Sequence, residues 1–264
     1  MNELMVLSYL ERIGAVHSKM QDEENLNRLI LCHLYTVPFE NLDVVDFGLV
    51  PDLKEEKIYD KIVTHRRGGY CFEQNTLFEV LLKELGYNVY PVAVRVMWNR
   101  DYIPPLSHMG LVVQMNGKKY YCDVGFGGPG PKGLLRLEES EQEIKGETFR
   151  VKTADDDDFL IERLHHGAWK TVLRFTDHEV READFMLMNF YCARNESVLF
   201  ATTRVLNLCT SAGSKALTGS ELTVRENGTE RKVVYGSKKE LEEGLRIEFG
   251  IEISLPDNRE EVSI

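Results

Sequence analysis

The spacing of hydrophobic residues changes along the chain and predicts an α+β fold in three domains. Up to about residue 86, hydrophobic side chains recur at three- and four-residue intervals, which is the period of an amphipathic helix. From there to about residue 195, they alternate with mostly smaller or polar residues, which is typical of strands. A hairpin signal and a capped helix follow. The expected domains are residues 1–86, 87–195 and 196–264.

The first domain is expected to contain several helices. One covers residues 26–34, with His33 packed on its apolar face. Asp52 stands three residues before Glu55, which resembles a capping box and predicts a helix start at this point. A further apolar run at residues 77–85 ends at a glycine, where a C-terminal cap is expected.

Short motifs punctuate the later domains. Pro91 lies inside a predicted strand and indicates an edge or a bulge, because proline cannot donate to a ladder. Asn227-Gly228 predicts a hairpin turn. Ser237, followed three residues later by an acid, predicts the start of a helix that ends at Gly250.

Asn116-Gly117 is a strong signal for a two-residue hairpin turn and fixes which residues face one another. One face of the hairpin is then entirely apolar, whereas a shift by one residue would mix the two faces. On the other face, His108 and Asp123 become diagonal neighbours about 7–8 Å apart, within reach of a histidine–carboxylate contact. An exposed polar pair is the alternative for such a diagonal. The apolar face pairs Val113 with Tyr120, Leu111 with Cys122 and Met109 with Val124; the other pairs Val112 with Tyr121, Gly110 with Asp123 and His108 with Gly125.

The stretch RGGYCFEQN places Cys71 after two glycines and at the start of a predicted helix. A thiol at a helix N-terminus meets the positive end of the dipole, which stabilises the nucleophilic thiolate. Cys71, His108 and Asp123 provide the residue types of a nucleophilic triad: a thiol, a base that moves its proton, and a carboxylate that orients the base. The histidine is expected to lower the thiol pKa. The meeting of Cys71 with His108 is inferred, and the Cys71 backbone N–H is the candidate oxyanion donor.

The composition is that of a globular protein and restricts the choice of partners. Of the 264 residues, 43% are hydrophobic, and no apolar run approaches the ~20 residues of a membrane span. The N-terminus lacks a secretory pattern, and the five cysteines cannot all pair, so we expect a cytoplasmic protein. A net charge of −11 argues against nucleic-acid binding, so any phosphate contacts must be local. The candidates for such contacts are Arg66, Arg67, Lys132 and Lys215.

No metal site is expected. The acids Asp155–Asp158 are adjacent, without the spacing of a ligand loop, and we interpret them as an exposed turn. The glycine-rich segment Gly125–Pro131 lacks the Gly-Lys-Ser/Thr ending of a nucleotide P-loop. It is expected to form a tight loop beside the triad, where backbone N–H groups can reach an anionic ligand.

Separated motifs in a fixed order resemble the arylamine N-acetyltransferase family over nearly the whole chain. The resemblance implies an N-terminal helical bundle, a β-barrel middle domain and a C-terminal α/β lid, with a thiol-enzyme core like that of papain or transglutaminase. It also implies a triad of Cys71, His108 and Asp123 and a ping-pong reaction. Acetyl-coenzyme A would acetylate the cysteine, and an arylamine or hydrazine would then take the acetyl group. The motifs are RGGYCFEQN, the His108 strand, DVGFG at 123–127, VPFENL at 37–42, MNFY at 188–191 and FATT at 200–203.

The same resemblance assigns binding residues. Phe39, Phe126 and Phe200 are expected to form a pocket in which a flat aromatic amine can stack. Gly127 and Gly128, in the glycine-rich loop, are expected at the coenzyme entrance.

The triad alone leaves alternative functions open. A thiol hydrolase of papain or transglutaminase type uses the same residues and differs in its acceptor, which is water or lysine. An amide synthase within the family would transfer a larger acyl group. A scaffold with an inactive triad is disfavoured because all three residues are present. The chain also departs from the family at Glu196, where proline is common, near the acceptor or coenzyme entrance.

Overall fold

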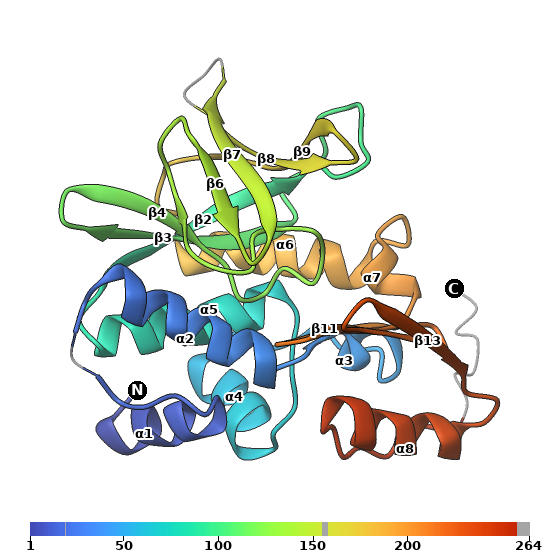
Figure 1. Ribbon diagram of the computed structural model, residues 1–264. Helices are drawn as coiled ribbons and strands as arrows, with labels where there is room; N and C mark the ends of the chain where they lie inside the picture. Colours follow the sequence, from blue (N-terminus) through green and yellow to red (C-terminus); the bar gives the residue numbers. More distant parts are fainter. Residues whose placement is uncertain (19, 155–157, 258–264) are drawn as a thin grey trace.

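The N-terminal helices pack below a barrel and around the helix that begins at Cys71 (Figure 1). The structure is a computed structural model, and it describes residues 1–18, 20–154 and 158–257. His33 is buried, with its ring nitrogens 2.7 Å from Tyr9 Oη and 3.0 Å from Gln74 Oε1, which confirms a packed histidine. The helical elements here are α1 (Glu3–Arg12), α2 (Glu23–Thr36), α3 (Leu42–Val45), α4 (Glu55–Tyr59), the π-helix η1 (Asp60–Thr64) and α5 (Cys71–Glu84).

The predicted helix start at Asp52 is wrong. Helix α4 begins at Glu55, its N-cap residue is Lys54, and no side chain caps it. The carboxylate of Asp52 instead accepts the N–H of Lys54 at 3.1 Å, two residues later. Aspartate forms such local turns as readily as it caps helices, so the spacing alone could not distinguish them.

Eight antiparallel strands form a sheet that curls into a nearly closed barrel (Figure 1). The spatial order is β5-β4-β3-β2-β9-β8-β7-β6. Gln142 on β6 joins the two edge strands, because its side-chain amide accepts the N–H of Arg136 at 2.9 Å and donates to the carbonyl of Arg136 at 2.8 Å. The strands are β2 (Asn88–Val96), β3 (His108–Met115), β4 (Lys118–Cys122), β5 (Leu135–Arg136), β6 (Glu141–Ile144), β7 (Glu147–Thr153), β8 (Asp158–His165) and β9 (Ala168–Thr176).

The β3–β4 hairpin has the predicted register. Asn116 and Gly117 have φ of 51° and 74°, and Met115 faces Lys118. The ladder runs to the pair of Leu111 with Cys122, so Asp123 lies just beyond the strand. Both faces of the hairpin are buried, one against the helices and the other inside the barrel. The alternative of an exposed His–Asp pair is therefore excluded.

Pro91 lies where β2 has a neighbour on one side only. Strand β2 pairs with β3 from Asn88 onward, but β9 joins its other side only from Val94. The carbonyl of Pro91 accepts the N–H of Val180 at 3.0 Å. The expected edge position is thus confirmed locally, within a strand that is otherwise interior.

A second sheet and a helix complete the chain. The sheet order is β1-β10-β11-β12-β13, so the short strand that carries Phe39 is paired with a strand far along the sequence. The predicted Asn227-Gly228 turn joins β12 and β13, and α8 is capped by Ser237 and by Gly250 at φ 68°, as expected. The remaining elements are β1 (Phe39–Glu40), α6 (Glu182–Arg194), α7 (Leu199–Thr202), β10 (Val205–Thr210), β11 (Gly213–Thr218), β12 (Glu221–Glu226), β13 (Thr229–Val234) and α8 (Lys238–Phe249).

Candidate active site

Cys71 is the first residue of α5, and its residue surface is only 6% exposed. The backbone of α5 touches the end of the hairpin there, because a Cβ on Gly125 would lie 2.7 Å from Cys71 Cα. Gly110 is equally restricted, since its Cβ would lie 2.5 Å from Tyr121 Oη. A side chain at either glycine would therefore disturb the place where the helix start meets the hairpin.

His108 and Asp123 form a buried pair beside this thiol. His108 Nε2 lies 2.7 Å from Asp123 Oδ2, and both side chains are almost fully buried. The Cys71 thiol lies near the same imidazole, because the charge of each group affects the pKa of the other. Because Nε2 is engaged by the carboxylate, Nδ1 is the ring nitrogen left for the sulfur. The structure thus brings the three predicted residues together in the order thiol, imidazole, carboxylate.

Two residues that sequence reasoning missed hold Asp123 in place. Asn75 Nδ2 donates to Asp123 Oδ1 at 2.9 Å and to the carbonyl of Met109 at 2.7 Å. Tyr121 Oη donates to Asp123 Oδ2 at 2.8 Å. Asn75 stands four residues after Cys71, hence on the same helix face, which is the signal that could have identified it.

In each residue of the triad, the effect of burial on the pKa is opposed by the charges of its neighbours. Burial lowers the pKa of His108, but the charge of Asp123 and the contact with Cys71 outweigh it and raise the pKa to about 10. Burial tends to raise the pKa of Asp123, but His108 and the hydrogen bonds from Asn75 and Tyr121 hold it below its ordinary value. Burial raises the pKa of the Cys71 thiol above its ordinary value, and the charge of His108 offsets this rise only in part. The sequence-based expectation of a lowered thiol pKa did not include the effect of burial, which disfavours the charged thiolate.

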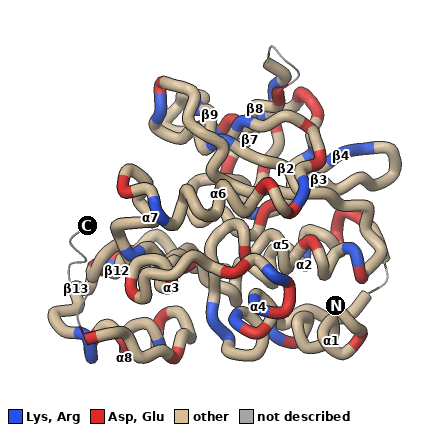
Figure 2. Tube along the Cα trace, turned by 180° about the vertical axis from the view of Figure 1, so that it is seen from behind, with Lys and Arg blue, Asp and Glu red and all other residues tan. Residues whose placement is uncertain are grey.

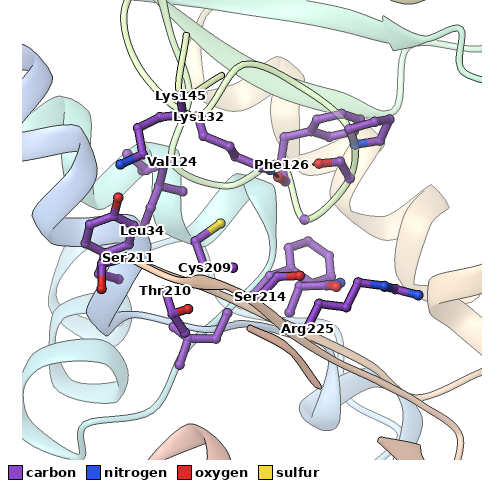
Figure 3. A pocket seen from close by; sticks show the side chains of 18 of the residues that line it. Leu34, Val124, Phe126, Lys132, Lys145, Cys209, Thr210, Ser211, Ser214 and Arg225 are labelled. Carbon is purple, nitrogen blue, oxygen red and sulfur yellow. Dashed lines mark hydrogen bonds between the residues drawn. The ribbon is translucent and has the colours of Figure 1, made fainter. Parts of the chain in front are cut away.

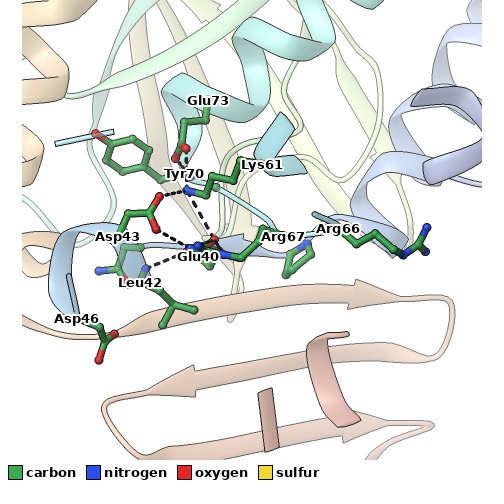
Figure 4. A network of polar contacts seen from close by, with 12 residues as sticks. Glu40, Leu42, Asp43, Asp46, Lys61, Arg66, Arg67, Tyr70 and Glu73 are labelled. Atoms are coloured by element: carbon green, nitrogen blue, oxygen red, sulfur yellow. Dashed lines mark hydrogen bonds and ion pairs between the residues drawn. The ribbon is translucent and has the colours of Figure 1, made fainter. Parts of the chain in front are cut away.

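A buried network of charges supports the start of α5 from below (Figure 4). Lys61 Nζ lies 2.7 Å from both Asp43 Oδ2 and Glu73 Oε1. Arg67 reaches Glu40 Oε1 at 2.7 Å and Asp43 Oδ1 at 2.8 Å. Glu73 also accepts the backbone N–H of the helix N-cap residue at 3.0 Å. Burial would lower the pKa of Lys61, but the charges of Glu40, Glu73 and Asp43 raise it above its ordinary value.

The three phenylalanines predicted to line the acceptor pocket take part in two ring–ring contacts. The ring centroids of Phe39 and Phe200 are 5.2 Å apart, and those of Phe126 and His108 are 5.0 Å apart. Phe39 and Phe126 line a cavity of about 680 Å³ (Figure 3). Val124 and Phe126 both belong to its wall, and the residue between them contacts Cys71. The cavity therefore adjoins the triad.

The glycine-rich loop forms one side of this cavity. Gly127 and Gly128 line it and lie close to aromatic rings: a Cβ on Gly127 would be 2.9 Å from Phe39 Cγ, and one on Gly128 would be 3.0 Å from Phe126 Cζ. Lys132 Nζ donates to the carbonyls of Phe126 at 3.0 Å and Gly128 at 2.7 Å. These glycines thus permit close packing of the loop on the rings.

The candidates for phosphate contacts have different surroundings. Lys132 lines the cavity, as expected of a residue that meets a ligand. Arg67 is held by the carboxylates of the buried network, and Lys215 Nζ lies 3.0 Å from Glu248 Oε2. Arg67 and Lys215 are therefore engaged by carboxylates, which the sequence could not show when they were considered for phosphate contacts. The carbonyl of Arg66 accepts a hydrogen bond from Arg12 at 3.2 Å.

Acidic and basic residues are interspersed along the chain in the view from behind (Figure 2). Across residues 1–18, 20–154 and 158–257, no group of three or more His, Cys, Asp or Glu side chains is arranged to hold a metal ion. The first three residues of the acidic run Asp155–Asp158 lie outside the described residues. None of the helices in the described part is long and apolar enough to cross a membrane.

Comparison with known proteins agrees with this geometry. A family model described as N-acetyltransferase matches residues 22–258. The chain is 32% identical to the arylamine N-acetyltransferase of Mycobacterium tuberculosis over 257 residues, which cover 95% of this chain and 90% of the relative. The arylamine N-acetyltransferase structure from Salmonella typhimurium has a TM-score of 0.88 at 28% identity and covers 100% of this chain and 95% of its own. The Mycobacterium marinum arylamine N-acetyltransferase in complex with CoA gives 0.85 at 29% identity, with 94% and 93% covered. The chain therefore belongs to the arylamine N-acetyltransferase family.

Proposed function

We propose that this enzyme transfers the acetyl group of acetyl-coenzyme A to the nitrogen of an arylamine or arylhydrazine through a thioester on Cys71. The observation that carries the proposal is the buried His108–Asp123 pair, 2.7 Å apart, next to Cys71 at the start of α5. Membership of the family supports the choice of donor and acceptor.

The first half-reaction acylates the enzyme. His108 takes the thiol proton, and Cys71 Sγ attacks the carbonyl carbon of the acetyl thioester. The bond to the coenzyme sulfur breaks as the tetrahedral oxyanion collapses, and the imidazolium returns its proton to the departing thiolate. Asp123 orients the ring and stabilises its positive charge. The backbone N–H of Cys71, one of the unpaired donors at the start of α5, is the proposed oxyanion donor.

The second half-reaction transfers the acetyl group to the acceptor. The amine nitrogen attacks the carbonyl carbon of acetyl-Cys71, and His108 removes a proton from this nitrogen. The carbon–sulfur bond breaks, the proton passes to the sulfur, and the free thiol is restored. The same imidazole therefore serves as base and acid in both halves, which its position between sulfur and carboxylate supports.

The cavity beside the triad supports the proposed binding residues. Phe126 stacks near His108, and Phe39, which lines the same cavity, contacts Phe200, so these rings would offer faces to a flat acceptor. Gly127 and Gly128 line the cavity, where the coenzyme would enter. The aromatic part of the wall would favour an aromatic amine over water.

Intact-mass spectrometry after mixing with acetyl-coenzyme A, without acceptor, tests the acyl-enzyme. One acetyl group should appear on the peptide that contains Cys71 and should be absent from Cys71→Ser. Cys122 and Cys192 are matched controls, since both are buried thiols elsewhere in the chain. An adduct on either of them alone would refute the assignment.

The acceptor is tested by following the loss of that acetyl group after free donor is removed. Three conditions are compared: buffer alone, an arylamine and a lysine peptide. Rapid loss only with the arylamine supports the proposal. Rapid loss in buffer that the arylamine does not accelerate would indicate the hydrolase alternative, and efficient acylation only by longer acyl donors would indicate the amide synthase.

A further inference from the structure

Two ammonium groups in the cavity beside the triad form no ion pair within the described part of the chain, although the carboxylate of Glu147 lines the same cavity and interacts with the charge of Lys132. Four basic side chains line this cavity: Lys132, Lys145, Arg163 and Arg225. Arg163 forms an ion pair with Glu147, and Arg225 lies 2.8 Å from Glu230. Within the described part of the chain, neither lysine forms an ion pair. The two lysines are therefore the cations that a ligand can use.

Lys132 is fixed in place by the glycine-rich loop. Its ammonium donates to the carbonyls of Phe126 and Gly128, which uses two of its three N–H bonds. Carbonyls hold an ammonium without neutralising its charge. The loop thus presents a fixed cation to the cavity, in addition to any backbone N–H groups.

Lys145 stands at the turn between β6 and β7 and also lines the cavity (Figure 3). Its φ of 52° and that of Gly146, 75°, belong to a turn in which asparagine or glycine is preferred at both positions. Its ammonium lies 5.5 Å from the centroid of the Tyr35 ring. Lysine is not a preferred residue at a left-handed turn position. A residue that departs from the preference of its backbone conformation is often selected for function, and this lysine faces the cavity.

Buried polar atoms around the same cavity lack partners. Tyr35 Oη, Thr210 Oγ1 and Arg163 Nε are inaccessible to solvent and have no hydrogen-bond partner among the described residues. All three residues line the cavity. Unpaired buried polar atoms are costly and uncommon, and their presence shows that the wall of this cavity is polar as well as aromatic.

We infer that Lys132 and Lys145 bind the phosphate groups of the acyl donor and so make this enzyme prefer coenzyme A thioesters to acetyl thioesters that lack phosphate. The inference rests on the proposed function. The net charge of the chain is −11, so anionic donors are repelled elsewhere and depend on these local cations. Charge-assisted hydrogen bonds to phosphate are among the strong ones, which makes their loss measurable.

The test compares two acyl donors in matched variants. Lys132→Met and Lys145→Met remove the charge and keep an apolar stem, and Lys118→Met, at the exposed tip of the β3–β4 hairpin, is the control. The donors are acetyl-coenzyme A and S-acetyl-N-acetylcysteamine, a thioester without phosphate. The rate of Cys71 acetylation is measured by quenched mass spectrometry as kcat/KM for each donor.

With acetyl-coenzyme A, each cavity variant should lose about 10- to 100-fold in kcat/KM, and Lys118→Met should lose none. With the small thioester, Lys145→Met and Lys118→Met should stay within about twofold of the natural enzyme, whereas Lys132→Met, which also releases the glycine-rich loop, should lose more with acetyl-coenzyme A than with the small thioester. No loss with acetyl-coenzyme A in either cavity variant would overturn the inference. Equal losses with both donors would also overturn it. Lys145→Met decides this point, because Lys145 does not hold the glycine-rich loop and its replacement should leave the loop in place. Absence of acetylation by both donors in the natural enzyme would instead refute the proposed function.

Discussion

Asn75 donates a hydrogen bond of 2.9 Å to Asp123, so the helix that carries Cys71 also holds the carboxylate that orients His108. The same amide accepts the N–H of Val124 at 3.0 Å and donates to the carbonyl of Met109. One side chain thus joins α5 to both strands of the hairpin. The nucleophile and the base are positioned as a unit, although they lie far apart in the sequence.

Replacement of Asn75 by alanine should therefore damage both geometry and stability. Three hydrogen bonds are lost, and Asp123 and two backbone groups are left buried with fewer partners. We expect the free energy of unfolding to fall by about 2–4 kcal/mol and the rate of Cys71 acetylation to fall at least about tenfold. Urea denaturation and quenched mass spectrometry measure the two effects. Asn88→Ala, which removes an exposed amide contact with Gln114, should change neither; equal effects in both variants would contradict the role of Asn75.

Asp123→Asn should abolish most activity while the fold survives. The amide can still hold the ring, but it offers no charge to stabilise the imidazolium and can force the wrong tautomer; in a serine triad the same change costs about 10⁴ in rate. Tyr121→Phe, which removes only the hydroxyl that donates to Asp123, should have a much smaller effect. Circular dichroism verifies folding, and single-turnover acetylation gives the rate. Near-natural acetylation by folded Asp123→Asn would exclude Asp123 from the mechanism.

The reactivity of Cys71 toward iodoacetamide should depend on His108. Burial raises the pKa of the Cys71 thiol, and the charge of His108 opposes this rise; the pKa of His108 is itself raised to about 10 by Asp123 and Cys71 against the cost of burial. Without His108 this opposition is lost, so we expect the alkylation rate at pH 7 to fall at least about tenfold in His108→Gln and the pH midpoint to shift upward. A natural enzyme whose rate rises only near the free-thiol pKa of about 8.5, together with an unchanged midpoint in the variant, would be incompatible with a thiolate–imidazolium pair.

The same pair should make stability depend on pH in a defined direction. A group whose pKa is higher in the folded state stabilises the fold fully below its unfolded pKa and loses this contribution as pH rises through its folded value. For His108 that interval runs from 6.5 to about 10. A Cys71→Ser background removes the thiol titration and also the contribution of Cys71 to the raised pKa, whereas the contribution of Asp123 remains. In this background the difference in unfolding free energy between His108 and His108→Gln should therefore shrink as pH rises above 6.5. A difference that is constant from pH 6 to 10 would contradict the raised pKa.

The hairpin shows why part of the site could be predicted from the sequence. A two-residue turn fixes a register, and a period of two then assigns every residue to a face, so Asn116-Gly117 located His108 and Asp123 together. Cys71 was found by the same kind of local rule, since glycines and helical spacing placed it at a helix start. The division into domains 1–86, 87–195 and 196–264 stays a prediction.

What escaped prediction depends on contacts between distant segments. Arg67 was a candidate for phosphate, but folding places it against Glu40 and Asp43, on a segment more than twenty residues away. No local pattern encodes such an ion-pair network. The proposed role of Lys145 could not be predicted, because it depends on a cavity that several other segments of the chain build. Local spacing thus identified the reacting groups, whereas the residues that hold them required the tertiary structure.

Gly125→Ala should separate the two halves of the triad. A Cβ at this position would lie 2.7 Å from Cys71 Cα and 3.0 Å from Asn75 Nδ2, and the first of these is a backbone atom of α5 that cannot rotate away. The hairpin must therefore shift relative to the helix, and a displacement of about 1 Å at a reacting centre can cost about 10²-fold in rate. We expect acetylation to fall by about that factor and the unfolding free energy to fall by about 1–3 kcal/mol.

Gly236→Ala is the matched control, because a Cβ there would meet only a flexible carboxylate oxygen of Glu240 at 3.5 Å. It should leave both quantities unchanged. Single-turnover acetylation of Cys71 and urea denaturation decide the outcome. If Gly125→Ala lost stability but kept its acetylation rate, the strain would have been absorbed elsewhere, and close contact between the hairpin and the start of α5 would not be what sets the distance between Cys71 and His108. If acetylation falls far more than stability does, the glycine serves the alignment of thiol and imidazole, because a general loosening of the core would lower both together.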